Sequence, residues 1–561
     1  MKLTISLLLV AGSLFAQKLS RDLIDSPRTG SVDVLVQYNA APTTHDHDRV
    51  RTRGGALKRE LSGVRSAAYK ISAADLDRLD GDPAVKSVSR DHAVRGALDL
   101  ALPTLGADIV QKNGTTGDGI GVAMIDSGFS YHNDVKQSRI VYAESFLDSK
   151  STWDFYGHGT HVAGILGGAG SKIKGLAPSV NIVNLRVLDA EGVGVDSDVI
   201  AAIDRAIELK DKYQIKIINL SLGRPVFESY TTDPLCQAVE RAWLAGITVV
   251  VAAGNDGRDN TGGRNGYGTI NAPGNHPLVI TVGSMKTMKT ANRADDRIAS
   301  YSSKGPTAID HVVKPDILAP GNQIVSLHSI TSMLGREYPG NIVPIAYTSL
   351  SSLASGYFLL SGTSMAAPMV SGAVALLLDR EPKLTPDQIK ARLMRTATKN
   401  FPQFSTATDP ITGQTYTSQY DIFTVGAGYL NVAEAIASSA KLTGRAASPT
   451  ARLTARGRVQ LVNTKYTLWG DYTLWGDKSN WSLYTIWGEN IFLKGDYTLW
   501  GDYTLWGDKS AWGDSKTAAF TALWGDYTLW GDYTLWGEAA SAARNAVATQ
   551  SARDILIRGE N

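Results

Sequence analysis

Three separated segments of the chain carry side chains that together could break an acyl bond. Asp126 ends an apolar run and opens a glycine turn, His158 lies between two glycines, and Ser364 begins a long apolar stretch. A neutral hydroxyl needs a base to become a nucleophile, and the base needs an anion to orient it. A hydroxyl at a helix start is also well placed for negative charge that develops nearby. Asp, His and Ser in this order therefore fit an acyl-transfer triad.

The sequence around these residues predicts a parallel sheet that would position them. Between residues 119 and 284, short apolar runs alternate with helical stretches. Strands that are apolar throughout and linked by helices are typical of a parallel sheet covered on both faces, and active-site groups cluster at the carboxyl ends of such strands. The expected strands are 121–125, 182–187, 215–220, 247–252 and 279–282, and the expected helices are 161–166, 197–209, 238–245, 364–378 and 385–396.

These segments resemble those of the subtilisin-like serine proteases, the subtilase family. The triad segments read G-V-A-M-I-D-S-G from Gly121, G-H-G-T-H-V-A-G from Gly157 and S-G-T-S-M-A-A-P from Ser361. Other matching segments are N-L-S-L-G, A-A-G-N-D-G, Y-S-S-K-G-P and G-A-G-Y-L-N, and the resemblance covers about residues 102–437. We therefore expect an α/β chain, in which a subtilisin-like parallel sheet flanked by helices follows a small α+β propeptide and precedes a β-rich repeat tail.

Catalytic roles follow from the resemblance, position by position. It implies that Ser364 is the nucleophile, that His158 is the general base and then the general acid, and that Asp126 holds the imidazole in its productive tautomer. Asn255 matches the amide of the family's oxyanion hole, which donates to the substrate oxygen together with the main-chain N–H of Ser364.

The resemblance also implies a substrate cleft. One wall would pair with an extended peptide backbone by strand addition, and the other would close the first specificity pocket. The residues of the first wall are Ser221, Leu222 and Gly223, and those of the opposite wall are Ala253 and Gly254.

No metal site is predicted. His161 lies three residues after His158, but no Glu stands between them and no third ligand is evident, so we interpret His161 as structural. Residues 166–176 lack the asparagine-bearing insertion with which many relatives bind calcium, which argues against a tight calcium site there. We expect no required cofactor, and calcium binding stays open but is assigned no site. The single Cys236 excludes an intramolecular disulfide and is expected to be a small buried core residue.

The N-terminal sequence predicts export and a removable prosegment. Lys2, an apolar run over residues 7–15 and Ala16 together are typical of a secretory signal peptide cut after Ala16. Beyond it, predicted strands (32–38, 68–71 and 84–89) and helices (49–64 and 73–80) would form a small α+β unit. The resemblance implies that this unit is the inhibitory propeptide, which assists folding and is removed by self-cleavage near residues 98–102.

The C-terminal part departs from the protease pattern. Residues 441–465 hold six Lys or Arg and no acid, which predicts a solvated linker. A hexapeptide Y-T-L-W-G-D then recurs between Tyr466 and Glu538, a pattern that favours a small β-solenoid or ladder. Ten acids against four lysines there would line the turns with carboxylates, which could bind divalent cations. Its tryptophans either pack the module's own core or contact a glycan, a cell surface or the substrate.

Overall composition limits the function classes. Lys plus Arg number 56 against 54 Asp plus Glu, so bulk charge gives no case for a nucleic-acid partner. No stretch reaches the roughly 18 apolar residues of a membrane helix, which predicts a soluble exported protein. We divide the chain into a signal peptide (1–16), an inhibitory propeptide (17–98), a catalytic domain (99–440), a basic linker (441–465), a repeat region (466–538) and a C-terminal tail (539–561).

The sequence thus predicts a secreted serine endopeptidase that acts on protein or peptide substrates, has its own propeptide as inhibitor, and is extracellular or cell-surface associated. The alternative is a non-catalytic adhesion or scaffolding protein that uses the Trp-rich repeat. Catalytic activity separates the two hypotheses.

Overall fold

The computed structural model describes two compact units, Met1–Arg95 and Gly96–Asn561. The described residues are 18–19, 21–24, 28–61, 65–90, 97–171, 173–260, 265–343, 356–409, 413–440, 444–453, 459–462 and 553–560. The expected signal peptide (1–16) and the hexapeptide repeat (466–538) lie outside them. Within these ranges, no helix is both long and apolar enough to span a membrane.

The first unit is a four-stranded antiparallel sheet with helices, in the order β2-β3-β1-β4. Its elements are α1 (Arg21–Ile24), β1 (Ser31–Tyr38), α2 (Thr44–Arg51), β2 (Ala56–Leu61), β3 (Ser66–Ser72), η2 (Ala73–Asp75), α3 (Leu76–Asp80) and β4 (Val85–Arg90). In β1, buried residues alternate with more exposed ones, as expected for a strand with one covered face. Val34, Val36, Tyr69 and Leu76 belong to a core of this unit's own.

The predicted helix over residues 49–64 is wrong. Helix α2 ends at Arg51, Gly54 takes a positive φ of 81°, and Ala56–Leu61 forms strand β2 beside β3. Ala56, Leu57 and Lys58 are exposed on this edge strand, so pairing with β3 rather than burial of an apolar stripe decides their conformation. The charged, helix-favouring composition was overridden by the glycine break and the sheet edge.

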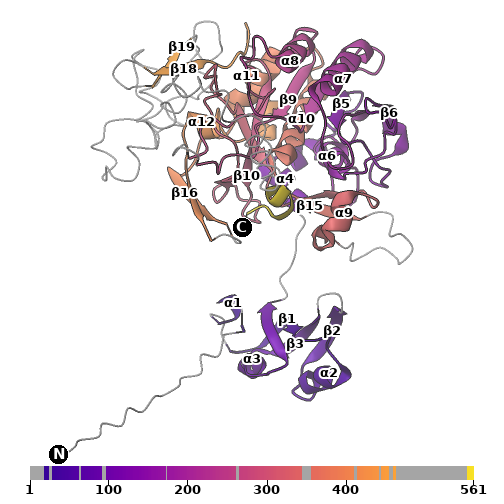
Figure 1. The fold of residues 1–561 in the computed structure, drawn as a ribbon, viewed down its shortest axis with the longest axis vertical. Helices are drawn as coiled ribbons and strands as arrows, with labels where there is room; N and C mark the ends of the chain where they lie inside the picture. Colours follow the sequence, from indigo (N-terminus) through magenta and orange to yellow (C-terminus); the bar gives the residue numbers. More distant parts are fainter. Residues whose placement is uncertain are drawn as a thin grey trace, which may run out of the picture. The chain divides into compact units, whose positions relative to one another are not determined.

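The second unit is built on an eight-stranded, mainly parallel sheet (Figure 1), which confirms the α/β class and the parallel sheet predicted for the catalytic domain. The strand order is β11-β10-β9-β8-β5-β7-β6, and β12 also pairs with β10. These strands are β5 (Gly121–Asp126), β6 (Ile140–Ser145), β7 (Asn181–Arg186), β8 (Ile215–Leu220), β9 (Thr248–Ala252), β10 (Ile280–Lys286), β11 (Arg297–Ile298) and β12 (Ile317–Pro320).

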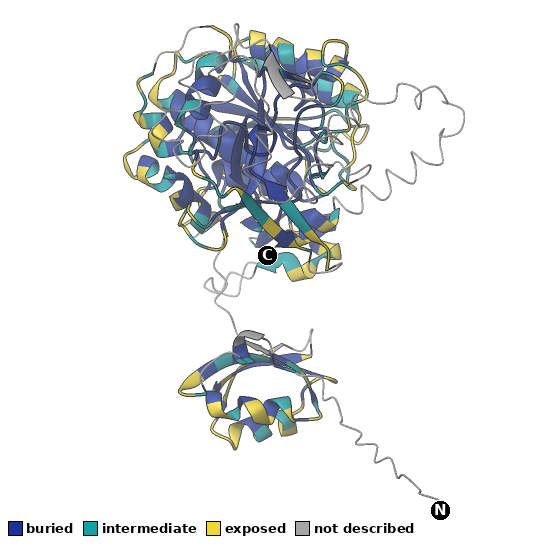
Figure 2. Cartoon of the chain, turned by 90° about the vertical axis from the view of Figure 1, so that its left-hand side faces the viewer, coloured by how far each residue is buried: buried dark blue, intermediate teal, exposed yellow. Residues whose placement is uncertain are grey.

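Helices cover this sheet and leave its central strands fully buried. All residues of β5, β9 and β10 are buried, and Figure 2 shows the buried centre of this unit in dark blue. Helix α6 packs against α10, and α7 packs against α8. The helices of the unit are α4 (Ala97–Leu105), α5 (Ala107–Lys112), α6 (His158–Gly167), α7 (Asp196–Leu209), α8 (Pro234–Leu244), α9 (Met333–Glu337), α10 (Thr363–Arg380), α11 (Pro386–Thr396), α12 (Ile422–Val425) and α13 (Val432–Ala437).

Smaller sheets surround this framework. Their strands are β13 (Ile324–Leu327), β14 (Ile342–Val343) and β15 (Tyr357–Leu360) in one sheet, β16 (Phe404–Thr408) with β17 (Thr415–Gln419) in a second, and β18 (Thr450–Leu453) with β19 (Val459–Val462) in a third. Strand β15 leads directly into the turn before helix α10, which begins at Thr363.

The prediction of a solvated linker is wrong for residues 446–451. Ala446, Ser448 and Ala451 are buried, and the main-chain N–H of Val313 donates to the oxygen of Pro449 at 2.8 Å. Ser448 Oγ donates to the buried carboxylate of Asp316 at 2.5 Å. A basic sequence without acids therefore packs here because its small uncharged residues meet the domain surface.

Candidate active site

The sheet and helix α6 bring Asp126 and His158 together. Asp126 is the last residue of β5, at the carboxyl end of a central parallel strand, and His158 is the first residue of α6 after Gly157, whose φ is +107°. The Nδ1 atom of His158 lies 2.7 Å from Oδ1 of Asp126, and the two side chains are 7% and 0% exposed. Since the ionised carboxylate only accepts hydrogen bonds, Nδ1 carries the proton and Nε2 is left as the acceptor, the tautomer that a general base needs.

Electrostatics at the pair favour a charged imidazolium. Burial alone would lower the pKa of His158, but the charge and hydrogen bond of Asp126, together with the charge of Asp154, outweigh burial, so the pKa of His158 is raised. Oδ1 of Asp126 also accepts the main-chain N–H of Ser127 at 2.7 Å. The carboxylate can therefore stabilise the proton that His158 takes up during acyl transfer.

A second carboxylate, which was not predicted from the sequence, fixes the loop around the pair. Asp154 is fully buried and accepts hydrogen bonds from Ser127 Oγ at 2.8 Å and from the N–H groups of Gly157 and Thr160 at 2.7 Å each. Ser127 Oγ accepts the N–H of Gly159 at 2.9 Å. Burial raises the pKa of Asp154. No pattern in the sequence marked Asp154, which lies seven residues before the predicted start of the helix at residue 161.

Ser364 lies in the first turn of α10, after Gly362, whose φ of +147° an ordinary residue would adopt only with strain. Among the described residues its hydroxyl donates to the main-chain oxygen of Ser221 at 3.0 Å, and not to the imidazole of His158. Ser221 Oγ in turn donates to the main-chain oxygen of Ser364 at 2.8 Å. Rotation about the Cα–Cβ bond of Ser364 would turn its hydroxyl away from Ser221, and hydrogen bonds of this kind often tighten only when substrate is bound.

The amide of Asn255 has a defined orientation. Its Oδ1 accepts the main-chain N–H of Thr363 at 2.9 Å and lies 3.1 Å from Thr363 Oγ1. A Cβ atom built on Gly362 would lie 3.2 Å from Nδ2, so the NH₂ end of the amide faces the turn before Ser364. Because the oxygen is held by Thr363, the NH₂ group is the end available to donate to a substrate oxygen. The role of Thr363 was not predicted, because it depends on contact with a distant loop.

The predicted cleft residues follow the ends of adjacent strands. Ser221, Leu222 and Gly223 follow β8, and Ala253 and Gly254 follow β9, its parallel neighbour. The N–H of Gly254 donates to Thr363 Oγ1 at 3.2 Å, and Ser221 contacts Ser364 as described above. Ala253 is fully buried, whereas Leu222 is partly exposed and Gly223 is exposed. Both predicted walls therefore touch the Thr363–Ser364 turn.

His161 and Cys236 take no part in this arrangement. The ring Nε2 of His161 lies 3.1 Å from the oxygen of Ile324 and 3.0 Å from that of Phe358, and burial lowers the pKa of His161 to about 3. Cys236 is buried, as predicted, and burial raises the pKa of its thiol. The part of the chain that the structure describes contains no group of three or more His, Cys, Asp or Glu side chains that could hold a metal ion.

Comparison with known proteins gives a consistent result. Residues 117–415 match the family model described as "Subtilase family". The chain is 35% identical over 349 residues to serine protease AprX of Bacillus subtilis (strain 168), and the matched region covers 60% of this chain and 75% of that protein. It is 36% identical over 301 residues to subtilisin DY of Bacillus licheniformis, covering 53% of this chain and 90% of the relative. It is also similar to subtilisin E of Bacillus subtilis (strain 168), with 31% identity over 368 residues, 64% of this chain and 82% of the relative.

Proposed function

The chain belongs to the subtilase family and is a serine endopeptidase, and from this premise we propose that Ser364, His158 and Asp126 are its catalytic triad, with Asn255 as the oxyanion donor. The observation that carries the proposal is the pair of fixed orientations in the site. Asp126 leaves Nε2 of His158 as the acceptor, and Thr363 leaves the NH₂ of Asn255 as the donor. Acyl transfer requires both: an acceptor for the proton of the nucleophile, and a donor for the carbonyl oxygen on which negative charge develops.

The proposed reaction forms and then hydrolyses an acyl-enzyme. Ser364 Oγ attacks the carbonyl carbon of the substrate while its proton passes to Nε2 of His158. Negative charge on the carbonyl oxygen is stabilised by Nδ2 of Asn255 and by the main-chain N–H of Ser364 in the first turn of α10. His158 then gives its proton to the leaving amine, and water, deprotonated by the same imidazole, releases the acid.

Protein or peptide substrates would bind beside this centre in an extended form. We propose that the Ser221–Gly223 segment pairs with the substrate backbone and that Ala253 and Gly254 close the opposite wall. Support for this comes from the contacts that tie both segments to the Thr363–Ser364 turn. A cleft assembled on rigid strand ends loses little entropy when it binds a peptide.

We also propose that the enzyme is exported as a precursor and removes its own first unit. The separate core of Met1–Arg95 supports a prosegment that folds by itself. We place the cut ahead of Ala97 rather than within residues 98–102, because helix α4 buries Ala101, Leu102 and Leu105 in the second unit. A protease needs an extended segment, and cleavage inside α4 would require that buried helix to unfold.

Intact-mass analysis of the full chain over time, comparing wild type with Ser364→Ala, tests the proposal. We expect the wild type alone to lose about the first 96 residues, with the new N-terminus at or before Ala97. A processed and active Ser364→Ala chain would contradict the triad. Parallel incubations with calcium and with a chelator test whether any cation is needed. The proposed surface or glycan contact of residues 466–538 stays a prediction, as those residues lie outside the described ranges.

A further inference from the structure

The last described segment, residues 553–560, is built into the second unit. Residues 553–558 are helical (Figure 1, yellow), and Ile555, Leu556 and Ile557 are 5%, 8% and 5% exposed. Leu556 and Ile557 join the main hydrophobic core of the unit, whereas Ile555 packs with Ala299 and Tyr301. The sequence had assigned these residues only to a C-terminal tail, yet they bury apolar surface as a core helix does.

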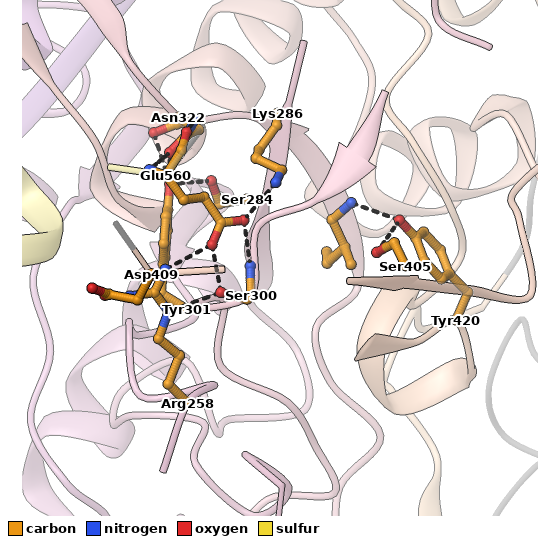
Figure 3. A network of polar contacts seen from close by, with 12 residues as sticks. Arg258, Ser284, Lys286, Ser300, Tyr301, Asn322, Ser405, Asp409, Tyr420 and Glu560 are labelled. Atoms are coloured by element: carbon orange, nitrogen blue, oxygen red, sulfur yellow. Dashed lines mark hydrogen bonds and ion pairs between the residues drawn. The ribbon is translucent and has the colours of Figure 1, made fainter. Parts of the chain in front are cut away.

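Glu560 ends the segment among polar side chains that bind its carboxylate and main chain (Figure 3). We call this set of residues the pocket, and it consists of Arg258, Lys286, Ser300 and Asn322. The residue is 1% exposed, and its carboxylate accepts hydrogen bonds from Ser300 N at 2.8 Å, from Arg258 Nη2 at 2.8 Å and from Ser300 Oγ. Lys286 Nζ lies 3.1 Å away as a second cation. One buried cation (Lys286), one partly buried cation (Arg258) and two Ser300 donors around one carboxylate make a charge-assisted site.

The same pocket also recognises the main chain of the segment. Asn322 Nδ2 donates to the oxygen of Glu560 at 2.6 Å, and the N–H of Glu560 donates to Asn322 Oδ1 at 2.9 Å. Gly559 has a φ of +60°, and a Cβ atom there would lie 2.3 Å from Ser361 Oγ and 2.6 Å from Asn322 Oδ1. Both the backbone conformation and the available space therefore demand glycine before the buried glutamate.

The pocket is connected to the two loops that hold the proposed oxyanion site. Arg258 lies three residues after Asn255, and Ser361 lies three residues before Ser364. The N–H of Ser361 donates to the oxygen of Leu556 at 2.7 Å, and the N–H of the next residue, Gly362, donates to Gly321 O at 2.8 Å. Residues 553–560 thus contact both loops, in each case at a residue three positions from a proposed catalytic side chain.

We propose that the second unit contains a peptide-binding site for the chain's own residues 553–560, and that their docking positions the Asn255 and Ser364 loops. The chain is consequently anchored to this unit on both sides of the repeat, at β19 and at Arg553. A cut inside the repeat would leave the C-terminal segment bound without a covalent link. The binding half of this inference stands apart from the proposed function, and the positioning half rests on it.

The binding half is tested on the full chain in a Ser364→Ala background, which prevents self-digestion. A recognition sequence for an unrelated site-specific protease is inserted between residues 540 and 551, the chain is cut there, and the products are separated by gel filtration. We expect the C-terminal peptide to co-elute with the large fragment. Separation of the two under native conditions would overturn the proposal.

Three substitutions make the binding test specific. Glu560→Gln removes the buried negative charge, and Asp554→Asn removes one from an exposed position of the same helix. We expect Glu560→Gln and Gly559→Ala to weaken binding of a labelled synthetic peptide of residues 551–561 to the emptied large fragment by at least about tenfold, and Asp554→Asn to leave it unchanged. Equal binding of the Gln and Asn variants would refute the assigned role of the pocket.

The positioning half is tested on active enzyme cut at the inserted site. We expect release of the peptide by dilution to lower kcat at least about tenfold with little change in KM, and added synthetic peptide to restore it. An unchanged kcat after complete release would refute positioning while leaving the binding site intact. If the uncut wild-type chain, with residues 553–560 docked, hydrolyses no peptide, that result would instead refute the proposed function.

Discussion

Replacing Asp126 by asparagine should separate the charge of this residue from its orienting role. Oδ1 of Asp126 accepts both His158 Nδ1 and the N–H of Ser127, whereas Oδ2 has no hydrogen-bond partner among the described residues. Since Ser127 N–H can only donate, the amide oxygen of the introduced asparagine will take the Oδ1 position and its NH₂ group the Oδ2 position. His158 then keeps its proton on Nδ1, so the productive tautomer survives although the charge is lost.

The expected loss follows from that charge alone. Two unit charges about 4 Å apart at an effective dielectric constant of about 20 attract each other by about 4 kcal/mol. Losing this stabilisation of the imidazolium in the transition state lowers kcat by about 10³. Serine proteases in which the same change produces the wrong tautomer lose about 10⁴ in kcat. The size of the measured loss in kcat therefore indicates which tautomer the variant holds. Asp126→Ala, which leaves Nδ1 without its acceptor, should be more damaging than Asp126→Asn.

The pH profile gives a second readout. Burial lowers the pKa of His158, and Asp126 is the main cause that raises it, with a smaller contribution from Asp154, so the pKa should fall in the Asp126→Asn variant. The general base must be neutral, and the acidic limb of kcat/KM should therefore move to lower pH. Rates would be measured on a peptide amide after processing by immobilised wild type, and ¹⁵N NMR in a Ser364→Ala background would identify the tautomer. A loss equal to that of Asp126→Ala, or an unmoved limb, would refute the reasoning.

Other predictions concern the oxyanion donor, a buried charge cluster and a buried lysine. Asn255→Asp should lower kcat more than Asn255→Ala despite its equal size, since it places an acceptor where a donor is needed; the Ala variant should lose about 10²–10³, the loss known for removal of the corresponding donor in a subtilisin. Asp316 lies 2.6 Å from Lys314 Nζ and 3.0 Å from Lys390 Nζ, all fully buried. Asp316→Asn should therefore lower the free energy of unfolding by about 3–5 kcal/mol in denaturant titrations, whereas the same change at exposed Asp211 should have no measurable effect. Burial lowers the pKa of Lys399 to about 7. Because the pKa of a lysine in the unfolded chain is near 10.4, the unfolded chain binds more protons than the folded chain above about pH 7, and the free energy of unfolding rises with pH. Lys399→Met should make this rise between about pH 7 and pH 9 smaller by about 2 kcal/mol. An unchanged dependence of the free energy of unfolding on pH would contradict the prediction.

The sequence predicted what depends on local pattern and missed what depends on distant contacts. Strand β8 was predicted at its observed bounds, because a continuous apolar run is buried on both faces of a parallel sheet. Strand β6, Ile140–Ser145, was not predicted because it is mostly partly exposed and carries a glutamate at the sheet edge. Asp154 and Glu560 were overlooked for a related reason. Nothing in their immediate sequence marks a buried carboxylate, and each accepts a hydrogen bond from a segment far away in the chain, Asp154 from Ser127 and Glu560 from Ser300.

Two of the proposed catalytic groups, Asp126 and Asn255, are oriented by a residue that is itself next to a proposed catalytic residue. Ser127, next to Asp126, fixes that carboxylate through its N–H and connects Asp154 to the start of α6 through its hydroxyl. Thr363, next to Ser364, fixes the amide of Asn255. A short displacement of either turn would therefore release the hydrogen bond that orients Asp126 or Asn255, and would also move a catalytic side chain. Reactions of this kind are sensitive to errors of about 1 Å in position. This coupling explains why a contact at Ser361, three residues from Ser364, can be expected to affect turnover although it touches no reacting atom.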